Sequence, residues 1–257
     1  MTKHGDADSL RILHEMHEHS FAARTMSAQA ARELGIRILR EVYPSGSLVP
    51  DETELSKELY VSRTVVREAI KILTAKGLVE ARPRLGTMVL PRRQWQILDR
   101  EMLGWQQAMS YSPERLMQLM EMRGVIEPAA AKLAARRRTQ TELERIRSAY
   151  DEMGDGVETP SEFVGADAKF HSAVLKACHN EYFDGLEALV FAGLLASIKI
   201  TNPQASDNTS SLPLHLRVLE AIEAADEQAA EAAMTDLLRD AKSRLMNEFN
   251  RGKGSPP

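Results

Sequence analysis

The stretch "LVPDETELSKELYVSRTVVREAIKILTAKGLVE", residues 48–80, contains two short helical patterns joined by a turn. Asp51 or Thr53 can cap the first helix, which is expected to end near Leu59. Ser62 is a suitable cap for the second. The apolar side of this second helix is formed by Val66, Ala69, Ile70 and Leu73. Two helices separated by about three residues are typical of a helix-turn-helix.

The sequence on either side extends this pattern. Residues 28–42 predict a preceding helix that is broken by Pro44 and Gly46. Its apolar stripe consists of Ala31, Leu34, Ile38 and Val42. After Gly77, two apolar runs flank the basic segment Arg82-Pro83-Arg84-Leu85-Gly86, which predicts a β-hairpin with a basic tip. A helix, a helix-turn-helix and a hairpin in this order predict a winged helix.

Basic residues are concentrated in this region. Arg63, Arg67 and Lys71 follow one another at four-residue steps, so a helix places them on one face. Residues 56–93 contain nine Lys or Arg against three Glu, a net charge of +6, although the whole chain has −4 and a pI near 6.0. This asymmetry favours a polyanionic partner, namely double-stranded DNA. The alternative is an amphipathic helix whose cations only face water.

A helix of this kind fits the major groove, where arginine pairs with guanine. Arg63 is the best candidate for a base contact and Arg67 the next, while Ser62 and Thr64 suit phosphate oxygens. In the predicted wing, the residues expected to reach the minor groove are Arg82, Arg84 and Gly86.

The rest of the chain reads as helix. Aromatic residues make up 5% of the sequence, and β-branched runs are few. We expect a mainly α protein in which helices near 113–137, 140–154, 160–178, 180–200, 211–225 and 227–250 form a bundle, with one polar loop at 201–213. No run reaches the roughly 18 apolar residues of a membrane span, and the first residues lack a signal-peptide core, so we expect a cytoplasmic protein. Cys178, the single cysteine, is expected to be a packing residue.

Five domain segments are expected. They are an N-terminal extension at 1–25 that contains His4, His14, His17 and His19, a winged helix at 26–91, a linker at 92–109, an all-α domain at 110–250 and a tail at 251–257. The linker is too apolar for a free tether, so its side chains are expected to pack against one domain. These side chains are Trp95, Ile97, Leu98, Met102 and Trp105.

Arg123 lies on the apolar stripe of the first long helix, with Glu127 one turn later. A buried arginine needs a partner. One interpretation is a salt bridge inside the bundle. The other is an arginine fork held for a carboxylate ligand.

Three further polar residues lie on apolar faces. Asp167 and His171 are one helical turn apart, and His215 lies on the inner side of a later helix. A single inward histidine such as His215 is more often a core residue with satisfied hydrogen bonds than a metal ligand. Together, one aspartate and two imidazoles suit a divalent transition metal such as Zn, Ni or Mn.

The motifs Pro50-x-Glu52-x-x-Leu55, "VSRTVVREA" and Gly86-Thr87-x-Val89 resemble the GntR family of bacterial transcription regulators over about 65 residues. Residues 110–247 are similar to the helical FCD-type effector domain of its FadR branch, through Arg123-x-x-x-Glu127, "DAKFH" at 167–171, Asn180 and His215. The resemblance implies DNA contacts at Ser62, Arg63, Thr64, Arg67 and around Arg84–Gly86. It also implies metal ligands at Asp167, His171 and His215, with effector contacts at Arg123, Glu127 and Asn180.

Three departures from the family pattern stand out. Leu237 occupies the position of the expected third histidine, which leaves either a three-ligand site completed by water or effector, or a pocket without a tight metal. Thr53 replaces a frequent basic contact, and Tyr60 replaces the usual turn glycine. The linker "RRQWQILDREMLGW" is similar to that of family members that control galactonate use, which favours a sugar acid such as galactonate as effector.

The sequence therefore predicts a homodimeric repressor that is released from its operator by a small carboxylate. Two alternatives are a metal-dependent hydrolase or lyase and a constitutive architectural DNA-binding protein. An enzyme does not account for the basic winged helix, and a purely structural bundle does not account for the inward polar residues.

Overall fold

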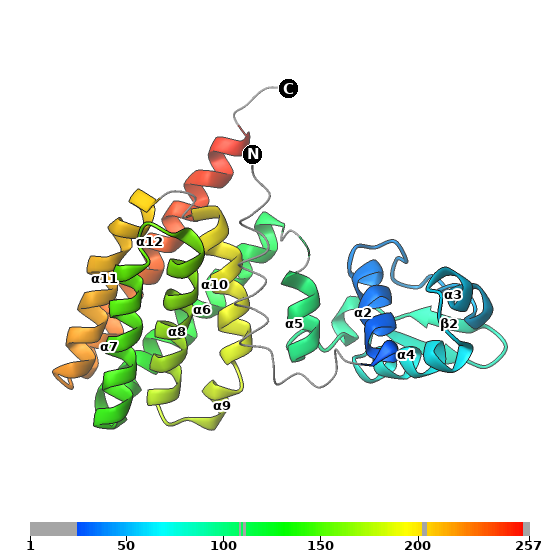
Figure 1. The fold of residues 1–257 in the computed structure, drawn as a ribbon, viewed down its shortest axis with the longest axis horizontal. Coiled ribbons are helices and arrows are strands. Elements are labelled where there is room, and N and C mark those ends of the chain that lie inside the picture. Colours follow the sequence, from blue (N-terminus) through cyan, green and yellow to red (C-terminus); the bar gives the residue numbers. More distant parts are fainter. Residues whose placement is uncertain (1–24, 108, 110–111, 202–204, 254–257) are drawn as a thin grey trace. The chain divides into compact units, whose positions relative to one another are not determined.

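The computed structural model describes residues 25–107, 109, 112–201 and 205–253 (Figure 1). They form two compact units that divide near residue 110. The predictions for residues 1–24 and 254–257 lie outside the described residues. In the described part of the chain, no helix is long and apolar enough to cross a membrane.

The N-terminal unit is a winged helix followed by a short helical linker. Its elements are α2 (Met26–Leu39), α3 (Glu52–Glu58), α4 (Arg63–Ala75), β1 (Val79–Arg82), β2 (Gly86–Val89), the 3₁₀ turn η2 (Arg92–Gln94) and α5 (Arg100–Gln107). Leu34, Leu55 and Leu73 lie in one apolar core shared by α2, α3 and α4. The predicted winged helix is confirmed.

Local capping fixes the two helices of the helix-turn-helix. Asp51 accepts hydrogen bonds from the backbone N–H groups of Thr53 (2.7 Å) and Glu54 (2.9 Å), and the Glu54 carboxylate accepts one from the Asp51 N–H, which completes a capping box. Ser62 caps α4. Between them Tyr60 adopts a left-handed conformation with φ +55°. Tyrosine thus takes the backbone conformation for which glycine is the usual residue.

The first helix ends earlier than the apolar stripe suggested. The helix predicted for 28–42 stops at Leu39, and Val42 is exposed rather than buried. Glu41 has φ +61°, and the N–H of Val42 bonds to the carbonyl of Arg37. These features form a Schellman motif, which turns the chain before Val42 can join the stripe.

The wing is a two-stranded antiparallel hairpin in which Val79 pairs with Val89 and Arg82 pairs with Gly86. Arg84 (φ +66°) and Gly86 (φ +106°) shape its exposed tip. Gly86 adopts its positive φ without strain because glycine has no Cβ.

The linker packs against the winged helix. Trp95, Met102 and Trp105 are buried in the core of the N-terminal unit. Ile97 and Leu98 are exposed, so the expectation that they pack is wrong. They belong to the irregular segment between η2 and α5, which is held by backbone bonds and by Gln96 rather than by its apolar side chains.

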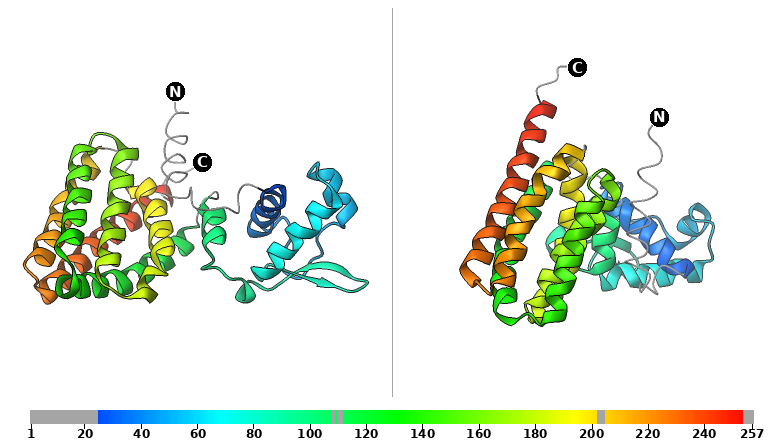
Figure 2. Two further views of the ribbon diagram at one scale, coloured as in Figure 1. Left: turned by 60° about the horizontal axis from the view of Figure 1, so that its bottom comes forward. Right: turned by 60° about the vertical axis from the view of Figure 1, so that its left-hand side comes forward.

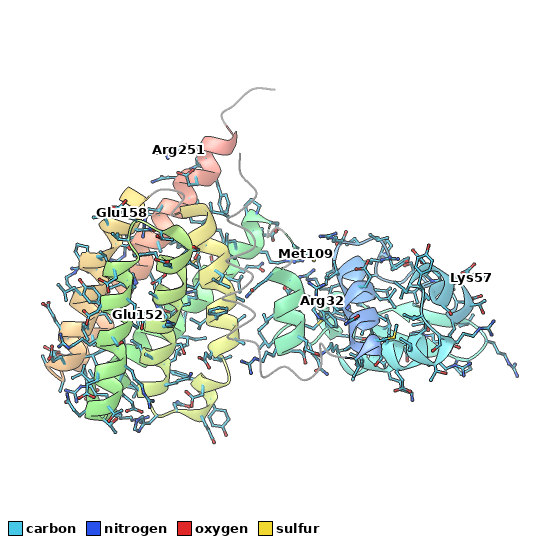
Figure 3. The ribbon with its side chains drawn as sticks, viewed as in Figure 1. Arg32, Lys57, Met109, Glu152, Glu158 and Arg251 are labelled. Atoms are coloured by element: carbon cyan, nitrogen blue, oxygen red, sulfur yellow. The ribbon has the colours of Figure 1, made fainter. Side chains whose placement is uncertain are left out.

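The C-terminal unit is an all-α bundle. Its elements are α6 (Pro113–Arg137), α7 (Gln140–Asp155), α8 (Pro160–Ala177), α9 (Glu181–Asp184), α10 (Glu187–Thr201), α11 (Ala205–Glu223) and α12 (Glu227–Lys253). Helix α8 packs against both α7 and α10, and α6 packs along α12 (Figures 1 and 2). Polar side chains such as Glu152 of α7 point away from the bundle (Figure 3).

Two helix predictions in the bundle are wrong. The helix expected at 180–200 is two helices, α9 and α10. The polar loop expected at 201–213 is largely the start of α11, which runs from Ala205 through Pro213. Its polar residues misled the prediction because Asn208 and Ser211 face inward, where Asn208 donates to the carbonyl of Val157 (2.9 Å) and Ser211 to that of Asn208 (2.9 Å).

Candidate functional site

Asp167, His171 and His215 meet inside the bundle. The first two lie one turn apart on α8, and His215 comes from α11. All three are buried, and one potential ligand atom from each lies within 4.8 Å of the others. Sequence reasoning therefore grouped these three side chains as the structure places them.

A hydrogen bond to the backbone determines which nitrogen of His215 carries the proton. Its Nδ1 lies 3.0 Å from the carbonyl oxygen of Ser211, which can only accept, so Nδ1 carries the proton. The lone pair of Nε2 then faces Asp167 Oδ1 at 2.7 Å. Two electron pairs repel each other at this distance unless a proton or a cation lies between them.

His171 sits between two carboxylates. Its Nδ1 contacts Glu127 Oε2, and its Nε2 lies 3.4 Å from Asp167 Oδ1. Among the described residues, three of the buried polar atoms that lack a regular hydrogen bond are Asp167 Oδ1, His171 Nδ1 and His215 Nε2. The side chains of Asp167, His171 and His215 match the ligand chemistry of a divalent transition metal. The carboxylate of Glu127, which contacts the other ring nitrogen of His171, matches the usual hydrogen-bond partner of a metal-binding histidine.

Arg123 and Glu127 form a buried salt bridge on α6, with Nε–Oε1 at 2.5 Å and Nη2–Oε2 at 3.4 Å. Burial alone raises the pKa of Glu127, but the charges of Arg123 and His171 overcome it and lower that pKa to about 2. The first interpretation of this pair, a salt bridge inside the bundle, therefore matches the geometry. Arg123 still lines the cavity, whereas Glu127 is not among the lining residues.

The acidic neighbours also act on His171. Burial lowers the pKa of His171, but Glu127 and Asp167 outweigh this effect and raise it to about 9. The pKa of Asp167 is lowered because the nearby histidines overcome the opposing effect of burial. At neutral pH the His171 ring therefore holds a proton between two ionised carboxylates, and a metal ion that bound to this ring would have to displace that proton.

A cavity of about 30 Å³ adjoins the cluster. Its polar lining consists of Arg123, Asp167, His171, Ser197, Ser211, His215 and Arg244. This volume has room for a water molecule or a bare ion, but not for a six-carbon acid. Binding such an acid therefore requires the side chains or the helices around the cavity to move.

Two lining residues come from α12. Leu237, at the position of the expected third histidine, is buried against the cavity. Arg244 follows it by seven residues on the same face and pairs with Asp240 (2.9 Å). Arg244 was not predicted as a site residue, although its spacing of two helical turns from Leu237 places both on the same face of α12.

Asn180 is not brought to this cavity. It caps α9, where its side chain accepts a hydrogen bond from the N–H of Tyr182 (3.1 Å). This position gives Asn180 a structural role. Its resemblance-based assignment as an effector contact gains no support from the geometry.

The N-terminal unit exposes all the predicted DNA-contact residues. Helix α4 exposes Ser62, Arg63, Thr64 and Arg67, and the wing exposes Arg82, Arg84 and Gly86. Arg67 pairs with Glu52 (2.7 Å) and Arg82 with Glu80 (2.8 Å). The sequence analysis did not assign roles to these two acidic residues.

Comparison with known proteins identifies both units. The model for bacterial regulatory proteins of the gntR family matches residues 26–89, and the FCD domain model matches residues 118–240. The chain is 33% identical over 213 residues to the galactonate operon transcriptional repressor of Escherichia coli K12, covering 82% of this chain and 93% of that protein. It is 35% identical over 201 residues to the HTH-type transcriptional regulator LutR of Bacillus subtilis 168, covering 76% and 90%.

The solved structure of Lar, a protein of Listeria monocytogenes, has the same fold, with a TM-score of 0.63. The two sequences are 17% identical, and the match covers 87% of this chain and 98% of the Lar chain. The matches to both units and the 33% identity across most of the chain agree with the winged helix and the helical bundle. The chain thus belongs to the gntR family of bacterial regulatory proteins and is an effector-regulated DNA-binding transcription regulator, not an enzyme.

Proposed function

We propose that the chain is a homodimeric repressor of sugar-acid genes, released from DNA by a galactonate-type acid bound beside a metal ion. The observation that carries this proposal is the buried Asp167–His171–His215 cluster, which opens onto a cavity with two arginines. The similarity to the galactonate operon repressor supports the choice of acid. A regulator that reads chromosomal DNA works in the cytoplasm.

Asp167, His171 and His215 would hold a divalent ion such as Zn²⁺, Ni²⁺ or Mn²⁺. The ion would supply a positive centre that a carboxylate or hydroxyl oxygen can bind. Glu127 would orient the His171 ring through its contact with Nδ1, and the carbonyl of Ser211 would orient the His215 ring in the same way. Because Leu237 offers no ligand atom, water or the effector itself would complete the coordination shell.

The remaining polar lining suits a hydroxylated acid. Arg244 offers a guanidinium for the carboxylate, and Arg123 adds Nη1, its one guanidinium nitrogen that is not bonded to Glu127. Ser197 and Ser211 place hydroxyl groups on the same cavity. This combination favours a polyhydroxy acid over a purely apolar acid.

The small cavity provides the basis for regulation. A six-carbon acid can bind only an arrangement in which this cavity is larger, and we propose that separation of the helices enlarges it, so the acid stabilises that arrangement over the compact one. If the compact arrangement is the one that fits the operator, the effector and DNA weaken each other's binding by the same factor. In a homodimer, two winged helices would read the two halves of a pseudo-palindromic operator.

The test combines calorimetry and DNA binding. Chelator-treated protein is titrated with each metal, and its melting temperature is then measured with galactonate, other aldonates and dicarboxylates. Asp167→Asn should weaken metal binding at least tenfold, whereas Asp151→Asn, an exposed change on neighbouring α7, should leave it unchanged. Galactonate should raise the melting temperature and reduce affinity for operator duplex selected from a random library.

Three results would contradict parts of the proposal. If no acid changes the melting temperature, the effector class is wrong. If galactonate stabilises the protein but leaves DNA affinity unchanged, the release mechanism is wrong and an architectural role gains support. If equal metal affinity is found in wild type and Asp167→Asn, the ion is not held at this cluster.

A further inference from the structure

An acidic residue stands within the basic DNA-contact face. Glu52, the first residue of α3, reaches Arg67 of α4, with Oε2 2.7 Å from Nε. The backbone at Glu52 is fixed, because the Asp51 cap holds the first turn of α3. Glu52 therefore reaches Arg67 of α4 from a part of the backbone that is itself held by hydrogen bonds.

Stability does not account for this pair. Its side chains are 62% and 36% exposed for Arg67 and Glu52, and such surface pairs contribute little to folding. A negative charge on this face also opposes the approach of DNA phosphates. An acid that weakens general DNA attraction without stabilising the fold is best explained by a role in reading sequence.

The geometry of the guanidinium indicates that role. Arginine can present two edges, one containing Nε and one containing only the two terminal nitrogens. Glu52 occupies Nε, which leaves the edge of terminal nitrogens for another partner. That edge matches guanine O6 and N7, the paired acceptors of the major groove.

Arg63 provides the contrast on the same helix. In the part of the chain that the structure describes, no carboxylate forms an ion pair with Arg63, and its side chain is exposed. Arg63 does act on Asp51 at longer range: the backbone N–H groups of Glu54 and Thr53 lower the pKa of the Asp51 carboxyl, and the charge of Arg63 adds to this effect. An arginine whose Nε is not bonded to a carboxylate can turn toward phosphates as readily as toward bases. The sequence put Arg63 before Arg67 for base contact, and the bond between Glu52 and Arg67 makes Arg67 a second candidate of equal interest.

We propose that Glu52 is a positioning residue that holds Arg67 as a guanine reader and so sets one guanine in each operator half-site. The inference rests on the operator binding proposed above. It assigns Arg67 to base recognition and makes Glu52, which touches no base in this arrangement, a determinant of sequence preference.

The experiment compares full-length wild type with Glu52→Ala, Glu52→Gln and Arg67→Ala. Each protein selects duplexes from a random library, and affinities are then measured for the selected wild-type site and for its single-base variants. Glu68→Gln is the matched control, because Glu68 is an exposed acid on α4 that pairs with Lys71. Circular dichroism checks that every variant is folded.

We expect wild type to prefer guanine at one half-site position by about tenfold or more. Glu52→Ala and Arg67→Ala should reduce that preference to about threefold or less, and Glu52→Ala added to Arg67→Ala should reduce it no further. Preferences at other positions and in Glu68→Gln should be unchanged. Affinity for unrelated duplex should stay the same or rise in Glu52→Ala, since a negative charge is removed.

Two outcomes overturn the inference in distinguishable ways. If wild type selects a site and Glu52→Ala selects the same site with the same guanine preference, Glu52 does not position a base reader, while the proposed function stands. If wild type selects no sequence, operator recognition itself fails and the inference fails with it.

Discussion

Lys76 at the end of α4 forms ion pairs with the linker. Replacing it should destabilise the N-terminal unit and leave the stability of the helical bundle unchanged. Lys76 follows α4 and is only 7% exposed. Its Nζ lies 2.6 Å from Asp99 and 2.6 Å from Glu101, and 5.4 Å from the centre of the Trp105 ring. Methionine at this position keeps the apolar stem but removes the charge.

The magnitude follows from these contacts. Breaking a fully buried ion pair from one side costs about 3–5 kcal/mol. Here the two carboxylates are 28% and 30% exposed, so water compensates part of the loss. Methionine also loses the contact of the Lys76 ammonium with the Trp105 ring but keeps an apolar side chain at this position. We expect Lys76→Met to lower the free energy of unfolding by about 2 kcal/mol, or roughly 8–16 °C in the melting temperature of a unit of this size.

The pH dependence has a definite sign. Burial opposes the charge on Lys76, but Asp99 and Glu101 outweigh it and raise its pKa. A pKa that is higher in the folded state contributes stability that is fully present below the unfolded value of about 10.4 and is lost as pH rises through the folded pKa. The difference between wild type and variant should therefore be constant from neutral pH to about pH 9 and shrink at strongly alkaline pH.

Tryptophan fluorescence isolates the relevant transition. The chain has two tryptophans, Trp95 and Trp105, and both are buried in the N-terminal unit. Lys57→Met, which changes an exposed lysine of α3 (Figure 3), is the control and should change stability by less than about 0.5 kcal/mol. A Lys76→Met variant as stable as this control, or one in which only the bundle melts earlier by circular dichroism, would refute the argument.

Three other substitutions test separate features. Tyr60→Gly should stabilise the N-terminal unit by about 0.5 kcal/mol in urea unfolding, because relief of the left-handed strain exceeds the entropy lost by glycine; a loss of stability would count against it. Gly35→Ala should destabilise by about 1–2 kcal/mol, since an added Cβ overlaps the Trp105 ring, and unchanged thermal unfolding would exclude that overlap. Leu237→His should tighten zinc binding by tenfold or more in calorimetry through a fourth ligand, and equal affinity would place the ion elsewhere.

The helix-turn-helix was predictable because its signals are local. The Asp51 capping box, the Ser62 cap and the hairpin around Arg84 each act over a few neighbouring residues. The sequence was less reliable where several neighbours decide the outcome together. Val42 continued an apolar stripe, yet the turn at Glu41 removed it from the helix.

The candidate site was likewise predictable in part from local sequence signals. Helical spacing alone put Asp167 and His171 on one inner face, and the apolar pattern around His215 turned it inward. Tertiary packing decided that α11 brings His215 to Asp167, that α12 adds Leu237 and Arg244, and that Asn180 caps α9 away from the cavity. It also placed Glu52 against Arg67. Periodicity determines which face of a helix is buried, but only the packing of helices distant in sequence determines which buried faces meet.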